Sequence, residues 1–513
     1  MLELAVPAPV PAVPSTPRRA AGAWWSHPAL LLGVAGALIG FAGSWLPSYW
    51  GDEAASVLAA NRSWPNLLLL IGHVDAVHGV YYAGLHLWTA VFGTSELATR
   101  LPSAVGVGFL VAGVVVLARL LGGGRLAWIA GVVAIALPRT MFMAVEARSY
   151  ALGTAVAVWV TVLLVELLRR ERRRMLWLGY AASMAAAMYL FLYLGLLLAV
   201  HAGFVLLFHR GRIQVWARSA ALAVVLAVPI LVMGFLERRQ IGFLANRDYA
   251  GVSNVLVGQW FGDPVFATLA WALITVALGA TVAPLVRRRA AVEPARLRLV
   301  ALAALWLLLP TALLLLGNAV VAPMYIARYV SFCVPAAAML IAVGVDLVAR
   351  FLGRRRLGEP LALGIALATI VAVAAPDYLA QRGEFAKDGG SDWRAVASYL
   401  ESHAASGDAV VFDQTTKPSR DPRLVADLYP ASVARLRDVA LVSPAGDGGE
   451  LWDTVDSNET LGASIVESRE VWAVELSVGT TPPSDVTFLE RLGYVVADSA
   501  LIHRTTVFHL VKE

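Results

Sequence analysis

Two adjacent carboxylates stand where the first long apolar segment of the chain ends. Asp52 and Glu53 directly follow Tyr49-Trp50-Gly51. A carboxylate near low-dielectric surroundings holds its proton more tightly than one in water, and this property suits a general base. Alternatively, Asp52 caps a helix that begins at Glu53; the two roles are compatible, because the two side chains would point in different directions. Asp52 and Glu53 are therefore the candidate catalytic residues.

Histidine and acidic side chains cluster shortly after this pair. His78 is one of three histidines within fourteen residues, and Asp75 stands beside it. Asp75 and His78 could hold zinc, although their spacing fits no strong metal signature. They could also satisfy each other's hydrogen bonds in an interfacial helix. The interpretation we favour is substrate binding, in which imidazole and carboxylate grip a sugar hydroxyl or a phosphate oxygen.

Charged residues also occur where two later apolar segments begin. Glu146 and Arg148 are costly in such a place unless they pair or bind something. Arg148 can bind a phosphate through two N–H groups while Glu146 holds it in place; a pair that reaches toward water is the alternative. Arg328 lies in one of the connections between apolar segments that carry few basic residues. Such connections are expected on the extracytoplasmic side of a membrane. The partner of Arg328 would be a lipid headgroup or the phosphate of a lipid-linked substrate.

Composition decides the class of protein. Of 513 residues, 59% are hydrophobic and 15% are charged, against about 45–50% and 25% in soluble domains. A soluble enzyme, a disordered tail and a nucleic-acid-binding arm are thereby excluded as the main architecture. The net charge of +5 comes from basic runs between apolar segments, as in cytoplasmic loops, so we expect no nucleic-acid partner. The single cysteine, Cys333, excludes an internal disulfide and a thiolate metal site.

The apolar segments predict an α-helical polytopic membrane protein. About 20 apolar residues cross the hydrocarbon core, and eleven segments qualify as spans, namely 28–46, 101–120, 125–143, 149–168, 175–190, 191–208, 218–236, 264–286, 299–317, 329–349 and 359–376. Residues 80–92 are too few to span, and we expect them to lie in the membrane interface. If 80–92 were a short span, the arginine-bearing connections would be divided between the two sides of the membrane. With 80–92 in the interface, most of them fall on one side, which the positive-inside rule assigns to the cytoplasm.

This topology divides the chain into three parts. Residues 1–27 are the expected cytoplasmic tail, and 28–376 the membrane domain, in which 47–100 form the first extracytoplasmic loop with its interfacial helices. Because the number of spans is odd, residues 377–513 lie outside, where charge, Gly and Pro become frequent. Alternating helices and strands predict a small extracytoplasmic α/β domain there. The expected elements are helices at Trp393–Ala404 and Val486–Leu492 and strands at Ala409–Phe412, Val471–Leu476 and Val507–Val511.

The polar segments, taken in order, resemble the membrane glycosyltransferases of the C-type fold, and most closely family 39, which includes the protein O-mannosyltransferases and the aminoarabinose transferases of lipid A. The matching stretches are Trp50-Gly51-Asp52-Glu53 with Ser56, Asp75-Ala76-Val77-His78 with Tyr81-Tyr82 and His86-Leu87-Trp88, Phe92-Gly93-Thr94-Ser95-Glu96 with Arg100-Leu101-Pro102-Ser103, Glu146-Ala147-Arg148-Ser149-Tyr150, and Arg328-Tyr329. One departure is Gly79-Val80, which stands where the family has paired prolines. The resemblance covers about residues 28–350.

The resemblance implies an inverting transfer of a sugar from a polyprenyl phosphate to a hydroxyl acceptor on the outer side. Asp52 would be the base, and Glu53 a second candidate as acceptor or structural partner. Asp75 and His78 would line the acceptor or phosphate side, and Glu146, Arg148 and Arg328 would face the carrier phosphate. The remaining substrate-binding candidates are the tyrosines of the matching stretches, Tyr81, Tyr82, Tyr150 and Tyr329.

The resemblance also limits the partners. We expect a hexosyltransferase of the plasma membrane that needs no cofactor; no residue is assigned as a metal ligand, and whether a divalent metal assists is open. Arginine so outnumbers lysine that the genome is expected to be GC-rich, as in an actinobacterium, and by that analogy the sugar is mannose. The acceptor is open among a secreted protein, a glycolipid and a cell-wall glycan. Rival classes are a transporter or flippase of a lipid-linked or anionic substrate, against which no inverted repeat is visible, and a non-catalytic scaffold.

Overall fold

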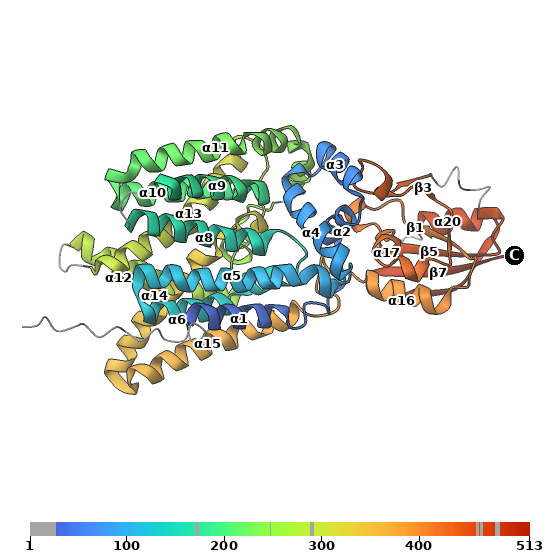
Figure 1. Ribbon diagram of the computed structural model, residues 1–513. Coiled ribbons are helices and arrows are strands. Elements are labelled where there is room, and N and C mark those ends of the chain that lie inside the picture. The colour runs from blue at the N-terminus through green and yellow to red at the C-terminus, as the bar shows by residue number, and fades with distance from the viewer. Residues whose placement is uncertain are drawn as a thin grey trace, which may run out of the picture.

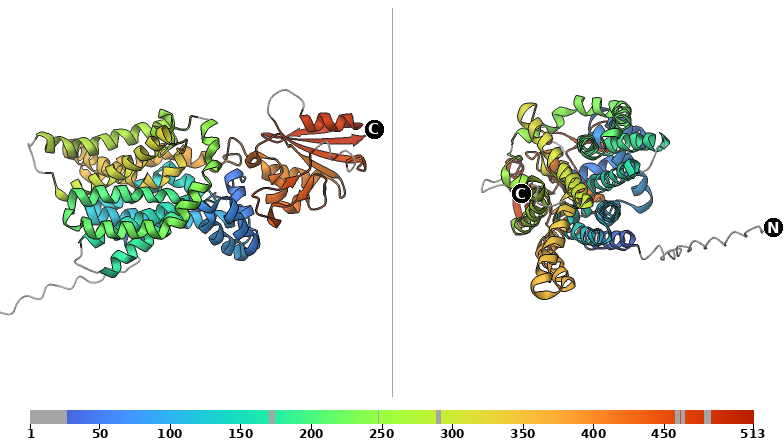
Figure 2. Two further views of the ribbon diagram at one scale, coloured as in Figure 1. Left: turned by 90° about the horizontal axis from the view of Figure 1, so that it is seen from above. Right: turned by 90° about the vertical axis from the view of Figure 1, so that its left-hand side faces the viewer.

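The computed structural model describes residues 27–169, 174–246, 248–287, 292–457, 461, 465–477 and 483–513. A bundle of long helices forms one end of the molecule and a strand-containing domain forms the other, with three short helices between them (Figures 1 and 2). The predicted tail at 1–27 lies outside the described residues except for His27. The C-terminal strand-containing domain was predicted and is confirmed.

Apolar helices occupy every segment in which a span was predicted. Among the described residues, seven helices are long and apolar enough to cross a membrane, or eight if α6 and α7, which are bent by 61° at the break between them, count as one; three more apolar stretches are shorter. The chain is a multi-pass membrane protein, while the number of eleven spans stays a prediction. The helices of the bundle are α1 (Pro28–Phe41), α5 (Glu96–Gly122), α6 (Gly124–Ala136), α7 (Pro138–Ala144), α8 (Tyr150–Arg169), α9 (Arg174–Leu190), α10 (Leu197–Phe208), α11 (Ile213–Leu236), α12 (Pro264–Arg287), α13 (Pro294–Val320), α14 (Val334–Leu352) and α15 (Glu359–Ala380).

Small residues bring the first helices of the bundle close together. A Cβ at Gly33 of α1 would lie 3.0 Å from the carbonyl oxygen of Gly108 in α5, so the two backbones nearly touch. Such close approach of small residues is a common way for helices to associate in membranes. Helix α14 is almost wholly buried at the centre, whereas α15, α12 and α11 bury little of their apolar stretch. These outer helices therefore face the lipid.

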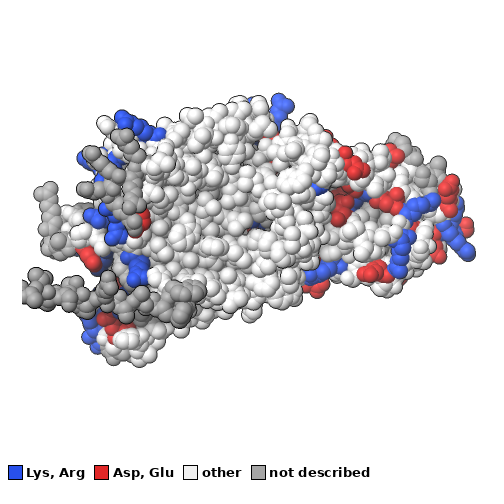
Figure 3. Space-filling model, viewed as in Figure 1, with Lys and Arg blue, Asp and Glu red and all other residues white. Residues whose placement is uncertain are grey.

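The surface of the molecule agrees with this assignment. The side of the bundle seen in Figure 3 is a broad band without charged side chains. Lysine, arginine and acidic residues gather at the end of the bundle away from the strand-containing domain and over that domain. A charge-free band of this kind suits the hydrocarbon core, where an unpaired charge is costly.

Three helices of the first loop lie between the bundle and the strand-containing domain: α2 (Gly51–Ala60), α3 (Trp64–His73) and α4 (Gly79–Phe92) (Figure 1). The last of these contains the segment 80–92, and its position at the end of the bundle agrees with the interfacial prediction. Apolar side chains project from its outer face, and Leu87, Val91 and Phe92 are all more than half exposed. A helix with such a face can lie against the membrane surface.

The strand-containing domain is a small α/β unit. Its five-stranded sheet has the order β2-β1-β5-β7-β6, in which β1 is parallel to β2 and β5, and β7 is antiparallel to both of its neighbours. All five elements predicted from the sequence are present, whereas β2 and β6 were not predicted. The strands are β1 (Ala409–Phe412), β2 (Arg437–Asp438), β3 (Leu441–Ser443), β4 (Thr454–Val455), β5 (Glu470–Leu476), β6 (Tyr494–Leu501) and β7 (Thr505–Lys512), and the helices α16 (Trp393–His403), α17 (Leu424–Leu428), α18 (Pro430–Val433) and α20 (Ser484–Arg491).

Helix α2 joins the two ends of the molecule. Tyr49, Ala54 and Val57 are buried in the same hydrophobic core as Trp393 and the inner face of β1 and β5. Arg62, just after α2, is almost fully buried and donates hydrogen bonds to three backbone carbonyls of residues 448–451 in the α/β domain. The loop that carries the candidate catalytic residues is thus fixed against the α/β domain.

Candidate functional site

A cavity of about 1500 Å³ lies between the end of the bundle and the α/β domain. One wall comes from the start of α2, the segment 74–78, the turns before α8 and α14, and the end of α11. The opposite wall comes from the α/β domain, chiefly residues 413–420 and the end of β5. Seven of the eleven predicted site residues line this cavity, namely Asp52, Asp75, His78, Arg148, Tyr150, Arg328 and Tyr329.

Asp52 faces the cavity in the first turn of α2. Helix α2 begins at Gly51 and its N-cap is Trp50, which makes no side-chain capping bond, so the alternative in which Asp52 caps a helix starting at Glu53 is wrong. Asp52 Oδ2 lies 3.2 Å from an Arg328 guanidinium nitrogen, and both side chains are about one-fifth exposed. The Arg328 guanidinium also lies over the Trp50 ring, 5.6 Å from its centroid. The Asp52 carboxylate is therefore accessible from the cavity and lies beside Arg328, whose guanidinium is positioned by the Trp50 ring.

Arg148 connects the two polar segments of the first loop. Its Nη1 donates to the carbonyl oxygen of Asp52 at 3.1 Å and to Ser56 Oγ at 3.3 Å. Its Nη2 lies 3.1 Å from His78 Nε2, which accepts the hydrogen bond because a guanidinium can only donate. Burial of the ring and the charge of Arg148 hold the pKa of His78 well below its ordinary value. His78 is therefore a neutral acceptor in this arrangement.

Asp75 is held in a constrained backbone conformation. Its φ of 59° is left-handed, which is uncommon for a residue other than glycine, and such strain is typical of functional sites. Tyr82 donates a hydrogen bond to Asp75 Oδ2 at 2.8 Å, and Glu237 Oε2 accepts one from the backbone N–H of Ala76 at 2.9 Å. Burial raises the pKa of the Asp75 carboxyl. Tyr82 thus acts on the cavity through Asp75 and does not line it.

The second candidate catalytic residue, Glu53, lies behind the cavity wall. Its side chain is fully buried and receives two hydrogen bonds from Arg100, at 2.7 and 2.6 Å, and one from the backbone N–H of Ala147 at 2.8 Å. Arg100 also donates to the carbonyl oxygens of Ser44 and Pro47. With its oxygens occupied, Glu53 fixes the relative position of α2, α5 and the segment before α8.

Glu146 and Tyr81 do not reach the cavity either. Both side chains are buried, and the Glu146 carboxylate lies 3.6 Å from the ammonium of Lys387, a residue of the segment that enters the α/β domain. Burial raises the pKa of Glu146 and lowers that of Lys387. The prediction that Glu146 faces the carrier phosphate is therefore not supported by its position; the pair instead ties the two ends of the molecule together.

Aromatic rings form the part of the cavity nearest the bundle. Tyr329 stacks on Tyr193 with ring centroids 4.7 Å apart, and Tyr150 meets Phe191 edge to face at 5.6 Å. Leu192, Ile241 and Phe243 extend this wall, so it is largely apolar. Arg238, in the connection that follows α11, also lines the cavity, while Arg247 of the same connection lies outside the described residues.

Several lining residues were not anticipated. Tyr193 and Glu237 stand in segments that carry no distinctive motif, and Lys417 and Arg420 belong to the α/β domain. Arg420 makes two hydrogen bonds to Asp388, at 2.9 and 2.6 Å. No local pattern could have revealed these residues, because they reach the cavity only through the tertiary packing of segments far apart in the chain. The isolated charge of Arg100 at the start of an apolar segment was the one available signal for the partner of Glu53.

No family model matches the chain, and no curated protein matches its sequence. Among solved structures, ArnT from Cupriavidus metallidurans in the apo state aligns over 94% of this chain and 97% of that one, at 13% identity and a TM-score of 0.56. The same protein bound to undecaprenyl phosphate aligns over the same shares, at 14% identity and a TM-score of 0.55. The chain has the C-type membrane glycosyltransferase fold. The apo oligosaccharyltransferase of Archaeoglobus fulgidus aligns over 88% of this chain and 70% of that one, at 10% identity and a TM-score of 0.49.

Proposed function

We propose that the protein is an inverting membrane glycosyltransferase that moves a sugar from a polyprenyl phosphate to a hydroxyl acceptor on the extracytoplasmic side. The observation that carries this proposal is the pairing of Asp52 with Arg328 in the large cavity, at 3.2 Å. A carboxylate and an arginine side by side supply both groups that the reaction needs. The fold supports it, since the similar structure of ArnT was determined with undecaprenyl phosphate bound.

The proposed chemistry assigns one task to each group. Asp52 takes the proton of the acceptor hydroxyl, the acceptor oxygen forms a bond to the anomeric carbon, and the bond from that carbon to the phosphate oxygen breaks. The leaving polyprenyl phosphate gains the electron pair, and Arg328 and Arg148 stabilise its charge through preorganised N–H groups. The apolar wall of aromatic and aliphatic side chains suits the isoprenoid chain.

Donor binding would also free the base. Without a phosphate, the Asp52 carboxylate is occupied by Arg328. A phosphate of higher charge competes for the same guanidinium, so the arrival of the donor releases Asp52 toward the acceptor. This order of events keeps the base inactive until the donor is in place and limits loss of the donor to water.

The remaining assignments follow the topology. We propose that the N-terminus is cytoplasmic, that 28–376 form the transferase domain of a plasma-membrane protein, and that 377–513 form an extracytoplasmic domain. The transferred sugar is a hexose, with mannose the first to test. A hydroxyl of a protein, glycolipid or cell-wall glycan reaches Asp52 from the α/β side of the cavity, where polar side chains predominate. Asp75 offers carboxylate oxygens that accept hydrogen bonds from the sugar or the acceptor, and the neutral His78 ring, whose Nε2 accepts from Arg148, offers its Nδ1–H as a donor.

The test compares two carboxylates of the same cavity. The purified protein in liposomes receives radiolabelled polyprenyl-phosphate mannose and a cell-envelope extract, and transfer is measured by extraction. Asp52→Asn is expected to reduce transfer at least 100-fold while the melting temperature is retained and donor binding is at least as tight as in wild type, because the variant loses both the base and the carboxylate that competes with the phosphate for Arg328. Glu490→Gln, which changes another cavity carboxylate, should leave transfer unchanged. Full activity in Asp52→Asn would refute the base assignment, and donor movement across the bilayer without transfer would favour a flippase.

A further inference from the structure

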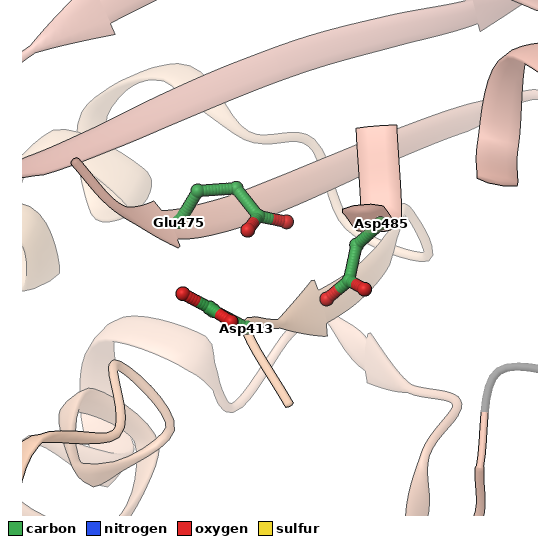
Figure 4. A group of neighbouring side chains, drawn as sticks. All are labelled: Asp413, Glu475 and Asp485. Atoms are coloured by element: carbon green, nitrogen blue, oxygen red, sulfur yellow. The ribbon is translucent and has the colours of Figure 1, made fainter. Parts of the chain in front are cut away.

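Three carboxyl groups of the α/β domain meet at the wall of the cavity opposite the bundle. Asp413 follows β1, Glu475 lies in β5 and Asp485 lies in the first turn of α20. One oxygen from each lies within 4.8 Å of the other two. All three residues are at most 3% exposed, and Figure 4 shows their carboxylates gathered around a common space. Three different elements of the domain therefore direct acidic groups to one point.

The charges of Asp413 and Glu475 are not balanced by a lysine or arginine within the described residues. Arg423, a largely buried arginine of this domain, pairs with Asp438 and Asp453, and no arginine or lysine forms an ion pair with Asp413 or Glu475. Buried carboxylates are normally paired or bound to a metal ion, because an uncompensated charge is costly there.

The Glu475 carboxylate has an oxygen atom without a hydrogen-bond partner in the part of the chain that the structure describes. Its Oε1 is buried and has no hydrogen-bond partner among the described residues. Asp413, in contrast, is fixed in place, since Oδ1 accepts from the backbone N–H and Oγ1 of Thr415 at 2.8 and 2.6 Å and Oδ2 accepts from the backbone N–H of Leu476 at 3.3 Å. Buried polar atoms in proteins almost always have a hydrogen-bond partner or bind an ion or water, so this oxygen is a site where a ligand would bind. In Figure 4 the Glu475 carboxylate is directed toward Asp485 and Asp413.

We propose that Asp413, Glu475 and Asp485 bind a divalent cation of the hard class, Mg²⁺, Ca²⁺ or Mn²⁺. The ligand set consists of carboxylate oxygens, which such ions prefer, and contains no imidazole or thiolate that would select zinc or copper. Asp413 and Glu475 line the cavity, so the open side of the site leaves coordination positions for water or for an oxygen of a bound molecule. The alternative, two carboxyl groups that share protons without a metal, makes opposite predictions for binding.

The experiment uses the full-length protein in detergent, treated with a chelator and then titrated with Mn²⁺ while free Mn²⁺ is followed by electron paramagnetic resonance. Wild type is expected to bind one Mn²⁺ per chain, and Mg²⁺ or Ca²⁺ should displace it. Glu475→Gln and Asp485→Asn should each weaken binding at least tenfold. Glu490→Gln is the matched control, because this carboxylate lines the same cavity outside the cluster, and it should bind as wild type does.

Two results would overturn the proposal. The first is folded wild-type protein that binds none of the three ions at millimolar concentration and whose melting temperature they do not raise. The second is Mn²⁺ binding that Asp52→Asn abolishes and Glu475→Gln does not, since the ion would then sit at the bundle wall. The two cluster variants must melt, metal-free, no lower than wild type to count. Because the titration requires neither donor nor acceptor, its outcome is separate from that of the transfer test.

Discussion

The glycine that precedes Asp52 packs tightly against the α/β domain. A Cβ added to Gly51 would lie 2.1 Å from the carbonyl oxygen of Ser419 and 2.8 Å from its Cβ. A carbon and a carbonyl oxygen approach normally to about 3.3 Å, so Gly51→Ala requires a displacement of about 1.2 Å between α2 and the segment around Ser419. The contacting oxygen belongs to the backbone, and no side-chain rotation can remove the clash.

A displacement of this size has a calculable effect on the proposed reaction. A misplacement of about 1 Å can cost about 100-fold in rate when a catalytic group must meet the reacting atom at 3–3.5 Å. We therefore expect Gly51→Ala to lower the turnover of sugar transfer about 100-fold. Affinity for the donor should change little, because Arg328 and Arg148 belong to the bundle end of the cavity. Initial rates at saturating donor, together with equilibrium binding of the labelled donor, separate the two effects.

Two glycines of the same loop provide controls. Gly72 in α3 and Gly84 in α4 would meet nothing within 4 Å of an added Cβ. Gly72→Ala and Gly84→Ala should therefore retain wild-type transfer and at least wild-type stability, since alanine is favoured over glycine in helices. A Gly51→Ala protein that folds and transfers at the wild-type rate would refute the reasoning, because α2 and the α/β domain would then be free to separate without consequence.

Three further results are expected. Glu53→Gln and Arg100→Met should each lower the free energy of unfolding by about 3–5 kcal/mol, since each leaves a buried partner without its counter-charge; the double variant should recover part of this, as measured by denaturant titration. Because the pKa of His78 is lowered in the folded protein, the unfolded chain binds the proton more readily, and the free energy of unfolding should fall as the pH drops below about 6.5. Melting curves at several pH values should show a smaller decrease in melting temperature for His78→Gln than for wild type. Arg328→Lys should weaken donor binding about tenfold by removing a two-pronged phosphate contact, and an equal affinity would argue against its phosphate role.

The membrane helices and much of the α/β domain could be predicted because their signals are local. An apolar run long enough to cross a bilayer defines a helix whatever its neighbours are, and the short apolar strand Ala409–Phe412 was located to the residue. Strand β6 was missed because its residues alternate too little and most of its length is exposed. Its position beside β7 depends on pairing that no local pattern reports.

The site was predicted in outline, and the differences lie in which carboxylate faces which partner. Asp52, Glu53 and Glu146 look alike in the sequence, since each stands at the end of an apolar segment. Their environments differ only through residues far along the chain: Glu53 meets Arg100 and Glu146 meets Lys387. Sequence spacing cannot reveal such tertiary partners, and this is why Glu53 was named a second catalytic candidate and Glu146 was expected to face the carrier phosphate.

The orientation of Asp52 follows from how α2 distributes its side chains. Successive residues of a helix point about 100° apart, so the four residues from Asp52 to Ala55 must face four directions. Glu53 points to Arg100 at the bundle, while Ala54 enters the core shared with the α/β domain. Both directions are fully buried, so α2 cannot turn about its axis without breaking an ion pair or opening a core. Asp52 is thereby left facing the cavity, so its buried neighbour Glu53 is the residue that orients the proposed base.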